Sequence, residues 1–362
     1  MSDTCVQQRT HRDLGIDAYR AFAMFVVVAW HWVFTIATWG ERGPRVDNPI
    51  SHHPSLGYLT WVLQVMPLFF LVGGHVAARS LAGHSSGVGA WAARRLRRLV
   101  VPAVPLLAAL LAAYLLARTF EASAVARAVV LVATPLWFLA VYVAIVAVVP
   151  LVHGAARRWP IGHVVALAAL CLVWDLGRFS GLVTGGALWV SMLLVWLTVH
   201  QLGGLLDRVD RRSGWWLVSV GLAALAVGTV VGPYPVSMVG TTTDEISNMG
   251  PPTAILLGLA LTQLGLVAVT RRRVTELSHR HRPFVESAAR FAMPVYLWHM
   301  VGFGACVVAA TAAGVDLPAE PTWQWWATRP LWVVGPLLVA RPLIRWSAGP
   351  SSPSATPARA RS

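Results

Sequence analysis

Lysine is absent from this sequence, and charged residues of either sign are scarce. Only 12% of the 362 residues are charged, whereas 56% are hydrophobic. A soluble domain would have difficulty covering its surface with so few charges, because globular chains carry about 25% charged residues. The composition therefore excludes an ordinary soluble globular protein and indicates an integral membrane protein.

Cysteine is also scarce. The chain holds three, Cys5, Cys171 and Cys306, and none of them forms a CxxC pair. This spacing indicates neither a metal site nor a disulfide framework. The first 16 residues are polar and lack a short apolar core followed by a small-residue cleavage site, so we expect no cleaved signal peptide.

What the sequence does contain is a series of apolar runs long enough to cross about 30 Å of hydrocarbon. We predict an all-α polytopic membrane protein with about ten transmembrane helices. The predicted spans are 17–38, 57–80, 99–118, 131–152, 161–178, 182–205, 215–232, 251–270, 285–312 and 326–346. Pro135 predicts a break in the fourth of these spans.

The net charge of +14 comes entirely from arginine. The arginines gather in short clusters between apolar runs, which follows the positive-inside rule and gives no reason to expect a nucleic-acid partner. The segments assigned to the cytoplasm hold Arg9 and Arg12; Arg94, Arg95, Arg97 and Arg98; Arg157 and Arg158; Arg208, Arg211 and Arg212; Arg271–Arg273, Arg280 and Arg282; and Arg359 and Arg361. This distribution predicts a multi-pass protein of the plasma membrane with both termini in the cytoplasm.

The chain accordingly divides into three parts. Residues 1–16 form a predicted cytoplasmic N-terminal segment, and residues 17–346 form a ten-helix transmembrane domain. Residues 347–362 form a Ser/Pro/Ala-rich tail that we expect to be disordered.

The first span, "DAYRAFAMFVVVAWHWVF" (17–34), carries Arg20 and His31. At about 100° and 1.5 Å per residue, these two side chains share one helical face and lie roughly 16 Å apart along the axis. Asp17, one turn before Arg20, can pair with it. Arg20 can also extend to the lipid headgroups, and His31 can form a hydrogen bond between helices. A neutral imidazole in a hydrated cavity is, however, well suited to accept a proton near pH 7.

Four further segments follow in order: "PLFFLVGGHVAARSL" (67–81), "RRLRRLVVP" (94–102), "TPLWFLAVYV" (134–143) and "MPVYLWHM" (293–300). Together with the Arg-x10-His first span, they resemble the acyltransferase 3 family of membrane O-acyltransferases over nearly all of residues 12–345. Two positions depart from the family pattern. Gly73 stands where the family often has serine, and His75 stands where it often has an aromatic residue.

The resemblance implies an enzyme that transfers an acyl group, usually acetyl from acetyl-CoA, to a hydroxyl of a glycan, lipid or secreted small molecule. It implies that Arg20 and His31 are essential, and it maps the family's Arg-x-x-Arg pair to Arg95 and Arg98. We expect His31 to act as the general base and the arginines to bind CoA phosphates. Acyl-CoA would be a donor substrate, and we expect no permanently bound cofactor and no metal. The cluster at 94–98 can instead fix topology or bind anionic lipid headgroups.

Three aromatic or histidine side chains are further candidates. Tyr296 and His299 lie one turn apart on one face of the ninth span. His299 can orient the acceptor, lie beside His31 or form a structural hydrogen bond, and Trp137 can line a tunnel or pack in the core. The polar loop 233–252 can cover the acceptor entrance or be a plain outer loop. The alternative function is a transporter of an anionic substrate, in which Arg20 and His31 mark the conduction path.

Overall fold

The structure, a computed structural model, describes residues 13–40, 43–83, 87–241 and 245–349. Most of the predicted N-terminal segment and of the predicted tail lies outside these residues, and so do Cys5, Arg9, Arg12, Arg359 and Arg361. The described part of the chain is built almost entirely of helices, with one short two-stranded sheet.

The α-helices are α1 (Leu14–Val33), α2 (Pro49–His52), α3 (Thr60–Leu63), α4 (Met66–Ala82), α5 (Val88–Val100), α6 (Val104–Thr119), α7 (Ser123–Ala133), α8 (Trp137–Arg158), α9 (Pro160–Phe179), α10 (Val190–Gly203), α11 (Arg211–Val230), α12 (Ile255–Arg280), α13 (Arg282–Ala312), α14 (Trp323–Ala327) and α15 (Arg329–Ser347). The strands are β1 (Ile36–Gly40) and β2 (Gly43–Asp47). Short 3-10 helices include η1 (Pro54–Leu59), η3 (Thr134–Leu136), η4 (Gly185–Trp189) and η5 (Leu206–Arg208).

Nine helical segments within the described residues are long and apolar enough to cross a membrane. They coincide with the first nine predicted spans, so the chain is an all-α polytopic membrane protein. The predicted tenth span is α15, a helix of 19 residues that packs against α13. Helix α15 carries Arg329, Arg341 and Arg345 and is not among the nine.

The first predicted span is too long at its C-terminal end. Helix α1 ends at Val33, and the chain then forms the antiparallel hairpin β1–β2, in which Ile36 pairs with Asp47. The run from Ile36 to Trp39 contains two β-branched residues, Ile36 and Thr38, and the aromatic Trp39, a composition that favours a strand. Hydropathy alone could not separate this strand from the helix before it.

The predicted break at Pro135 is confirmed. Helices α7 and α8 are separated by the 3-10 turn η3, which contains Pro135. Proline has no backbone N–H and disrupts the regular helical ladder. The carbonyl oxygen of Pro135 accepts a hydrogen bond from the hydroxyl of Tyr296 at 2.8 Å, which ties this break to α13.

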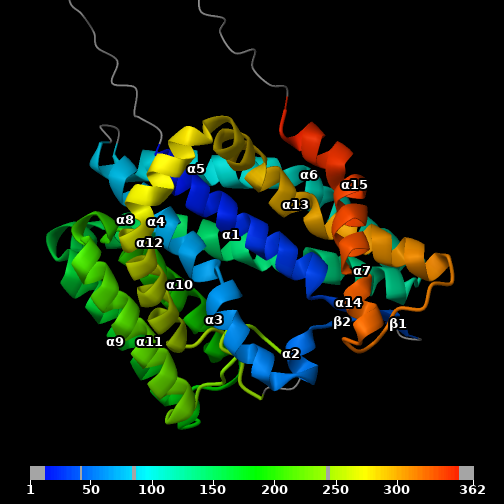
Figure 1. The fold of residues 1–362 in the computed structure, drawn as a ribbon, viewed down its shortest axis with the longest axis horizontal. Helices are drawn as coiled ribbons and strands as arrows, with labels where there is room; N and C mark the ends of the chain where they lie inside the picture. Colours follow the sequence, from blue (N-terminus) through cyan, green and yellow to red (C-terminus); the bar gives the residue numbers. More distant parts are fainter. Residues whose placement is uncertain (1–12, 41–42, 84–86, 242–244, 350–362) are drawn as a thin grey trace, which may run out of the picture.

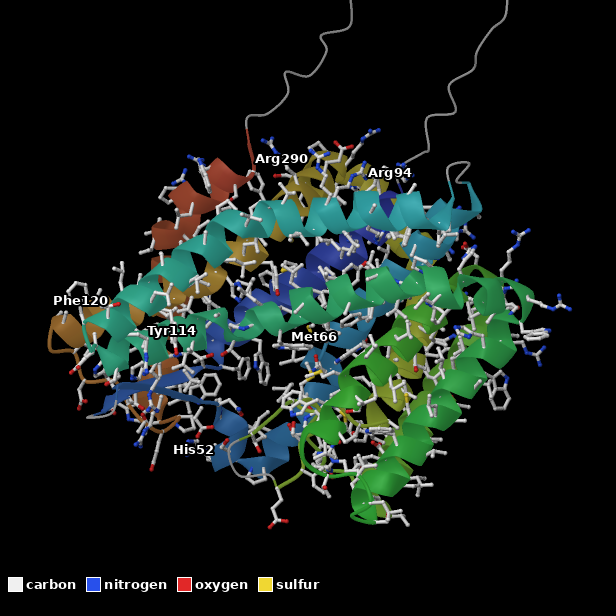
Figure 2. The ribbon with its side chains drawn as sticks, turned by 180° about the vertical axis from the view of Figure 1, so that it is seen from behind. His52, Met66, Arg94, Tyr114, Phe120 and Arg290 are labelled. Atoms are coloured by element: carbon white, nitrogen blue, oxygen red, sulfur yellow. The ribbon has the colours of Figure 1, made fainter. Side chains whose placement is uncertain are left out.

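Helix α1 runs through the middle of the bundle and contacts α4, α12, α13 and α15 (Figure 1). The first turn of α1 and the last turn of α15 lie on the same side of the molecule, the upper side in Figure 1. We call this the arginine-rich side, and Arg94 and Arg290 mark it in Figure 2. The hairpin and α2, where His52 is labelled, lie on the opposite side, called the hairpin side. That the arginine-rich side faces the cytoplasm stays a prediction.

Helices α11 and α12 approach closely through glycines spaced seven residues apart on each helix. Gly221 lies against Gly258, and Gly214 lies against Gly265. A Cβ built on Gly221 would lie 2.5 Å from the carbonyl oxygen of Gly258, so the backbones leave no room for a side chain. Small residues at this spacing let membrane helices pack in backbone contact.

The loop between α11 and α12 is held against η1, α3 and the turn before α4. Trp61 donates a hydrogen bond to the carbonyl of Val236 at 2.9 Å. Gln64 donates to the carbonyl of Met238 at 2.9 Å, and its own side-chain oxygen accepts from the backbone of Met66. These contacts fix the described part of the loop across the hairpin side of the bundle.

Asp207 of η5 contacts two helices, α4 and α12, on the arginine-rich side. Its carboxylate contacts Arg271 of α12 at 2.7 Å, Arg79 of α4 at 3.7 Å and His75 of α4 at 3.8 Å. Asp13, before α1, contacts both arginines, at 3.4 Å from Arg79 and 3.7 Å from Arg271. This network ties the ends of α1, α4 and α12 to η5.

Candidate functional site

The N-terminal half of α1 and helix α5 form one wall of a cavity of about 530 Å³ on the arginine-rich side. Four cationic side chains line it, and no aspartate or glutamate does; the four are Arg20, Arg94, Arg95 and Arg98. We call this the basic cavity. Arg97, also on α5, is exposed and is not among the lining residues. The structure therefore brings the predicted phosphate-binding arginines together from two segments of the chain.

Arg20 lines the basic cavity. Its side chain is 47% exposed and lies 3.7 Å from Asp17, the partner that the helical spacing predicted. An exposed guanidinium on a cavity wall can bind an anionic ligand.

His31 lines a second, smaller cavity of about 210 Å³ nearer the hairpin side. We call it the histidine cavity. Its walls are mostly apolar and aromatic, with Gln64, Trp137 and Tyr296 among them. Met66, labelled near the middle of the molecule in Figure 2, also lines it, whereas Arg94 of the basic cavity lies at the edge.

The two cavities adjoin. They share four lining residues, Met24, Phe69, Phe138 and Tyr296. On α1, Arg20, Met24 and His31 follow at spacings of four and seven residues, so one helical face passes from the first cavity to the second. The prediction that Arg20 and His31 share a face is confirmed, and the structure adds that each lies in a different cavity along that face.

The hydrogen bonds of His31 define which of its nitrogens carries a proton. Nδ1 lies 2.8 Å from the carbonyl oxygen of Val27, and a carbonyl can only accept, so Nδ1 carries the hydrogen. Nε2 then holds the lone pair of the ring. The residue is thus arranged to accept a proton at Nε2 without losing its link to the helix.

His299 lies directly beside His31. Its Nδ1 lies 2.7 Å from the carbonyl oxygen of Tyr296 and so carries a hydrogen, which leaves a lone pair on Nε2. That Nε2 is 3.3 Å from Nδ1 of His31, and the indole of Trp32 donates to the backbone carbonyl of His299 at 3.0 Å. Of the roles considered for His299, the structure shows the contact with His31 and a structural hydrogen bond to its own helix.

Of the three residues proposed to contact the acceptor or line a tunnel, Tyr296 and Trp137 line the histidine cavity, whereas His299 lines neither cavity. The Tyr296 hydroxyl donates to the carbonyl of Pro135, so its ring is fixed where the two cavities meet. The Trp137 ring also packs 6.1 Å from that of Trp196, so it has a packing contact as well.

The loop between α11 and α12 contributes to the histidine cavity. Val239, Gly240 and Met249 are among its lining residues. Residues 242–244 of this loop lie outside the described residues. The described part of the loop therefore forms part of the wall of the histidine cavity.

The two departures from the family pattern have separate surroundings. Gly73 lies against the ring of Tyr142, where a Cβ would come within 2.5 Å of the hydroxyl oxygen. His75 is 1% exposed and lies 3.8 Å from Asp207, far along α4 toward the arginine-rich side. Neither Gly73 nor His75 is among the lining residues of either cavity.

Sequence reasoning missed two residues of the site. Tyr142 of α8 lines the basic cavity and accepts a hydrogen bond from Arg95 at 2.9 Å. Gln64 lines the histidine cavity while its amide holds the loop. A glutamine within an apolar run is a signal that could have been used, because polar side chains at membrane depth are costly without a partner.

The described residues contain no group of three or more His, Cys, Asp or Glu side chains that could hold a metal ion. In the comparisons with known proteins, a family model described as an acyltransferase domain, that of acyltransferase 3, matches residues 13–343. No curated protein matches the chain, and no solved structure matches it.

Proposed function

Since the chain belongs to the acyltransferase 3 family of membrane O-acyltransferases, we propose that it transfers an acyl group, in particular acetyl, from acyl-CoA to the hydroxyl of an acceptor. The observation that supports this proposal is the shared wall between a cavity lined by four arginines and a cavity lined by His31. The acceptor would be a glycan, a lipid or a secreted small molecule. The membrane would be the plasma membrane, with the arginine-rich side in the cytoplasm.

The basic cavity suits the donor. CoA carries several phosphate charges, and guanidinium groups bind phosphate oxygens through paired hydrogen bonds. Arg20, Arg95 and Arg98 would hold these phosphates on the arginine-rich side. The long pantetheine arm would then extend past Phe69 and Phe138, which line both cavities, toward His31.

The histidine cavity suits the chemical step. Nε2 of His31 would remove the proton from the acceptor hydroxyl as the oxygen attacks the thioester carbonyl carbon. A carbon–oxygen bond forms, the carbon–sulfur bond breaks, and the proton passes from His31 to the departing CoA thiolate. Nδ1 keeps its hydrogen throughout and continues to donate it to Val27 and His299.

The transporter alternative has less support. A permease would need no thioester-binding cavity, and the chain belongs to a family of acyltransferases. An enzyme consumes acyl-CoA and labels an acceptor, whereas a permease moves its substrate unchanged, so one experiment distinguishes the two functions.

The test uses inverted membrane vesicles, in which the cytoplasmic side faces the medium, supplied with acetyl-labelled CoA. Wild-type protein should release CoA and transfer label to a vesicle lipid, glycan or added extract fraction. His31→Gln should abolish transfer, whereas His279→Gln, an exposed histidine on α12, should retain it. Transfer that persists at the wild-type rate in His31→Gln would overturn the assignment of the base.

A further inference from the structure

Tyr142 lies at the back of the basic cavity. It is 5% exposed, and its ring packs against Phe69, Phe70 and Phe138 with centroids 6.2, 5.8 and 5.9 Å away. These rings hold the tyrosine side chain in one orientation. Its hydroxyl therefore occupies a defined place on the cavity wall.

The hydroxyl of Tyr142 holds Arg95. It accepts a hydrogen bond from Nη2 of Arg95 at 2.9 Å, and the guanidinium lies 5.5 Å from the ring centroid of Trp91. Among the described residues, Arg95 forms no ion pair with a carboxylate. A neutral hydroxyl orients the guanidinium without compensating its charge, so the charge stays available to an anionic ligand.

Gly73 of α4 makes this arrangement possible. A Cβ built on Gly73 would lie 2.5 Å from the hydroxyl oxygen of Tyr142, 2.8 Å from Cε2 and 3.1 Å from Cζ. The ring of Tyr142 also packs against Phe69, Phe70 and Phe138, so it has little space to move away from a side chain at position 73. Any side chain at Gly73 would therefore displace the hydroxyl from Arg95.

We propose that Tyr142 is a positioning residue for donor binding, which holds Arg95 toward the phosphates of acyl-CoA in a space that Gly73 leaves open. This proposal rests on the proposed function, because it assumes that the basic cavity binds the donor. It adds that one of the four arginines depends on a residue of α8 and a residue of α4 for its orientation.

The test measures binding of CoA to the full-length protein in lipid nanodiscs by titration calorimetry. Tyr142→Phe retains the ring and removes the hydroxyl. It should weaken CoA binding by about three- to tenfold, the usual range for the loss of one ordinary hydrogen bond, because the lost bond acts on CoA only through Arg95. In the transfer assay, KM for acetyl-CoA should rise while kcat changes little.

A double-mutant cycle separates positioning from packing. In an Arg95→Gln background, the Tyr142→Phe substitution should have no further effect, because the partner of the hydroxyl is already gone. Effects that simply add would show that Tyr142 acts independently of Arg95, and would overturn the proposal. Tyr142→Phe binding that equals the wild type would overturn it as well.

Gly73→Ala provides a second variant, with Gly89→Ala on α5 as its control because nothing lies within 4 Å of a Cβ there. Gly73→Ala should weaken CoA binding, and Gly89→Ala should not. Binding of CoA to these variants tests the donor assignment of the cavity and the role of Tyr142 separately. If Arg95→Gln and Arg98→Gln both bind CoA normally, the donor assignment of the cavity is wrong; if they bind weakly while Tyr142→Phe is normal, only the role of Tyr142 is wrong.

Discussion

Nε2 of His299 lies 3.3 Å from Nδ1 of His31, which joins the first and the ninth membrane-spanning segments at the level of the histidine cavity. Each ring is also fixed to a backbone carbonyl of its own helix, His31 to Val27 and His299 to Tyr296. The two imidazoles therefore have complementary roles in this contact. His31 donates from Nδ1, and His299 accepts at Nε2.

This contact predicts that His299 supports the proposed base. When His31 gains a proton, its Nδ1–H becomes a stronger donor, and a lone pair on His299 stabilises the cation in a site of low dielectric. His299→Phe keeps a ring of similar size and removes the lone pair. We expect kcat to fall about tenfold, with little change in KM for acetyl-CoA.

The measurement is the initial rate of label transfer across a range of acetyl-CoA concentrations, at matched protein levels. His279→Phe is the control, since this side chain is exposed on α12. A rise in KM without a fall in kcat would assign His299 to donor binding instead of support of the base.

The sequence placed Arg20 and His31 correctly on one face because that relationship depends only on the period of a helix. A position beside His31 was one of three roles considered for His299, and the sequence could not choose among them, because those residues are 268 positions apart and only tertiary packing brings them together. The hydrogen bond from Arg95 to Tyr142 escaped prediction for the same reason.

The parts of the fold that depend on long apolar runs and on proline were likewise predictable. The point at which a helix ends and a strand begins was not. Long apolar runs fix the nine membrane-spanning segments, and Pro135 fixes the break before α8. Hydropathy does not separate an apolar strand from the end of an apolar helix. The predicted first span, 17–38, therefore includes the start of the hairpin that runs from Ile36 to Asp47. Helix α15 matches its predicted position yet carries three arginines.

A pair of arginine substitutions tests the basic cavity directly. Arg97 and Arg98 are neighbours on α5 and both are exposed, but only Arg98 lines the cavity. Arg98→Gln should raise KM for acetyl-CoA about tenfold, because a charged hydrogen-bond donor to phosphate is lost. Arg97→Gln carries the same change in net charge and should leave KM close to the wild-type value.

Steady-state kinetics at several ionic strengths make this comparison sharper. A general effect of surface charge would affect both variants alike and would weaken with added salt. Equal increases in KM for Arg97→Gln and Arg98→Gln would therefore contradict specific binding in the cavity and favour the lipid or topology role of the cluster.

The network at Asp207 predicts a pH-dependent contribution to stability. Burial by itself raises the pKa of this carboxyl, but the hydrogen bond from Arg271 and the charges of His75, Arg271 and Arg79 outweigh burial and lower the pKa below its ordinary value. The stabilisation is thus present above the unfolded pKa of about 4 and is lost as the pH falls through the lower, folded pKa.

Asp207→Asn should lower the midpoint of thermal unfolding in detergent by roughly 1–3 °C at pH 7, a modest effect because the carboxylate is 46% exposed. The difference from wild type should shrink as the pH drops below about 4. Glu276→Gln, which removes a more exposed pair with Arg272, is the control and should change the midpoint little. A difference that stays constant with pH would indicate that the charge of Asp207 is not its source.

The backbone contact between α11 and α12 predicts a large and local loss of stability when a side chain is added there. At Gly221, a Cβ would lie 2.5 Å from the carbonyl oxygen of Gly258 and 2.6 Å from the backbone nitrogen of Thr262, and backbone atoms cannot rotate away as a side chain can. Gly221→Ala should therefore force the helices apart and reduce the free energy of unfolding by about 2–3 kcal/mol. Gly154→Ala on α8, where nothing lies within 4 Å of a Cβ, is the matched control and should be neutral or slightly stabilising. Thermal unfolding of both variants in the same detergent checks the prediction, and an unchanged midpoint for Gly221→Ala would show that α11 and α12 do not pack in backbone contact.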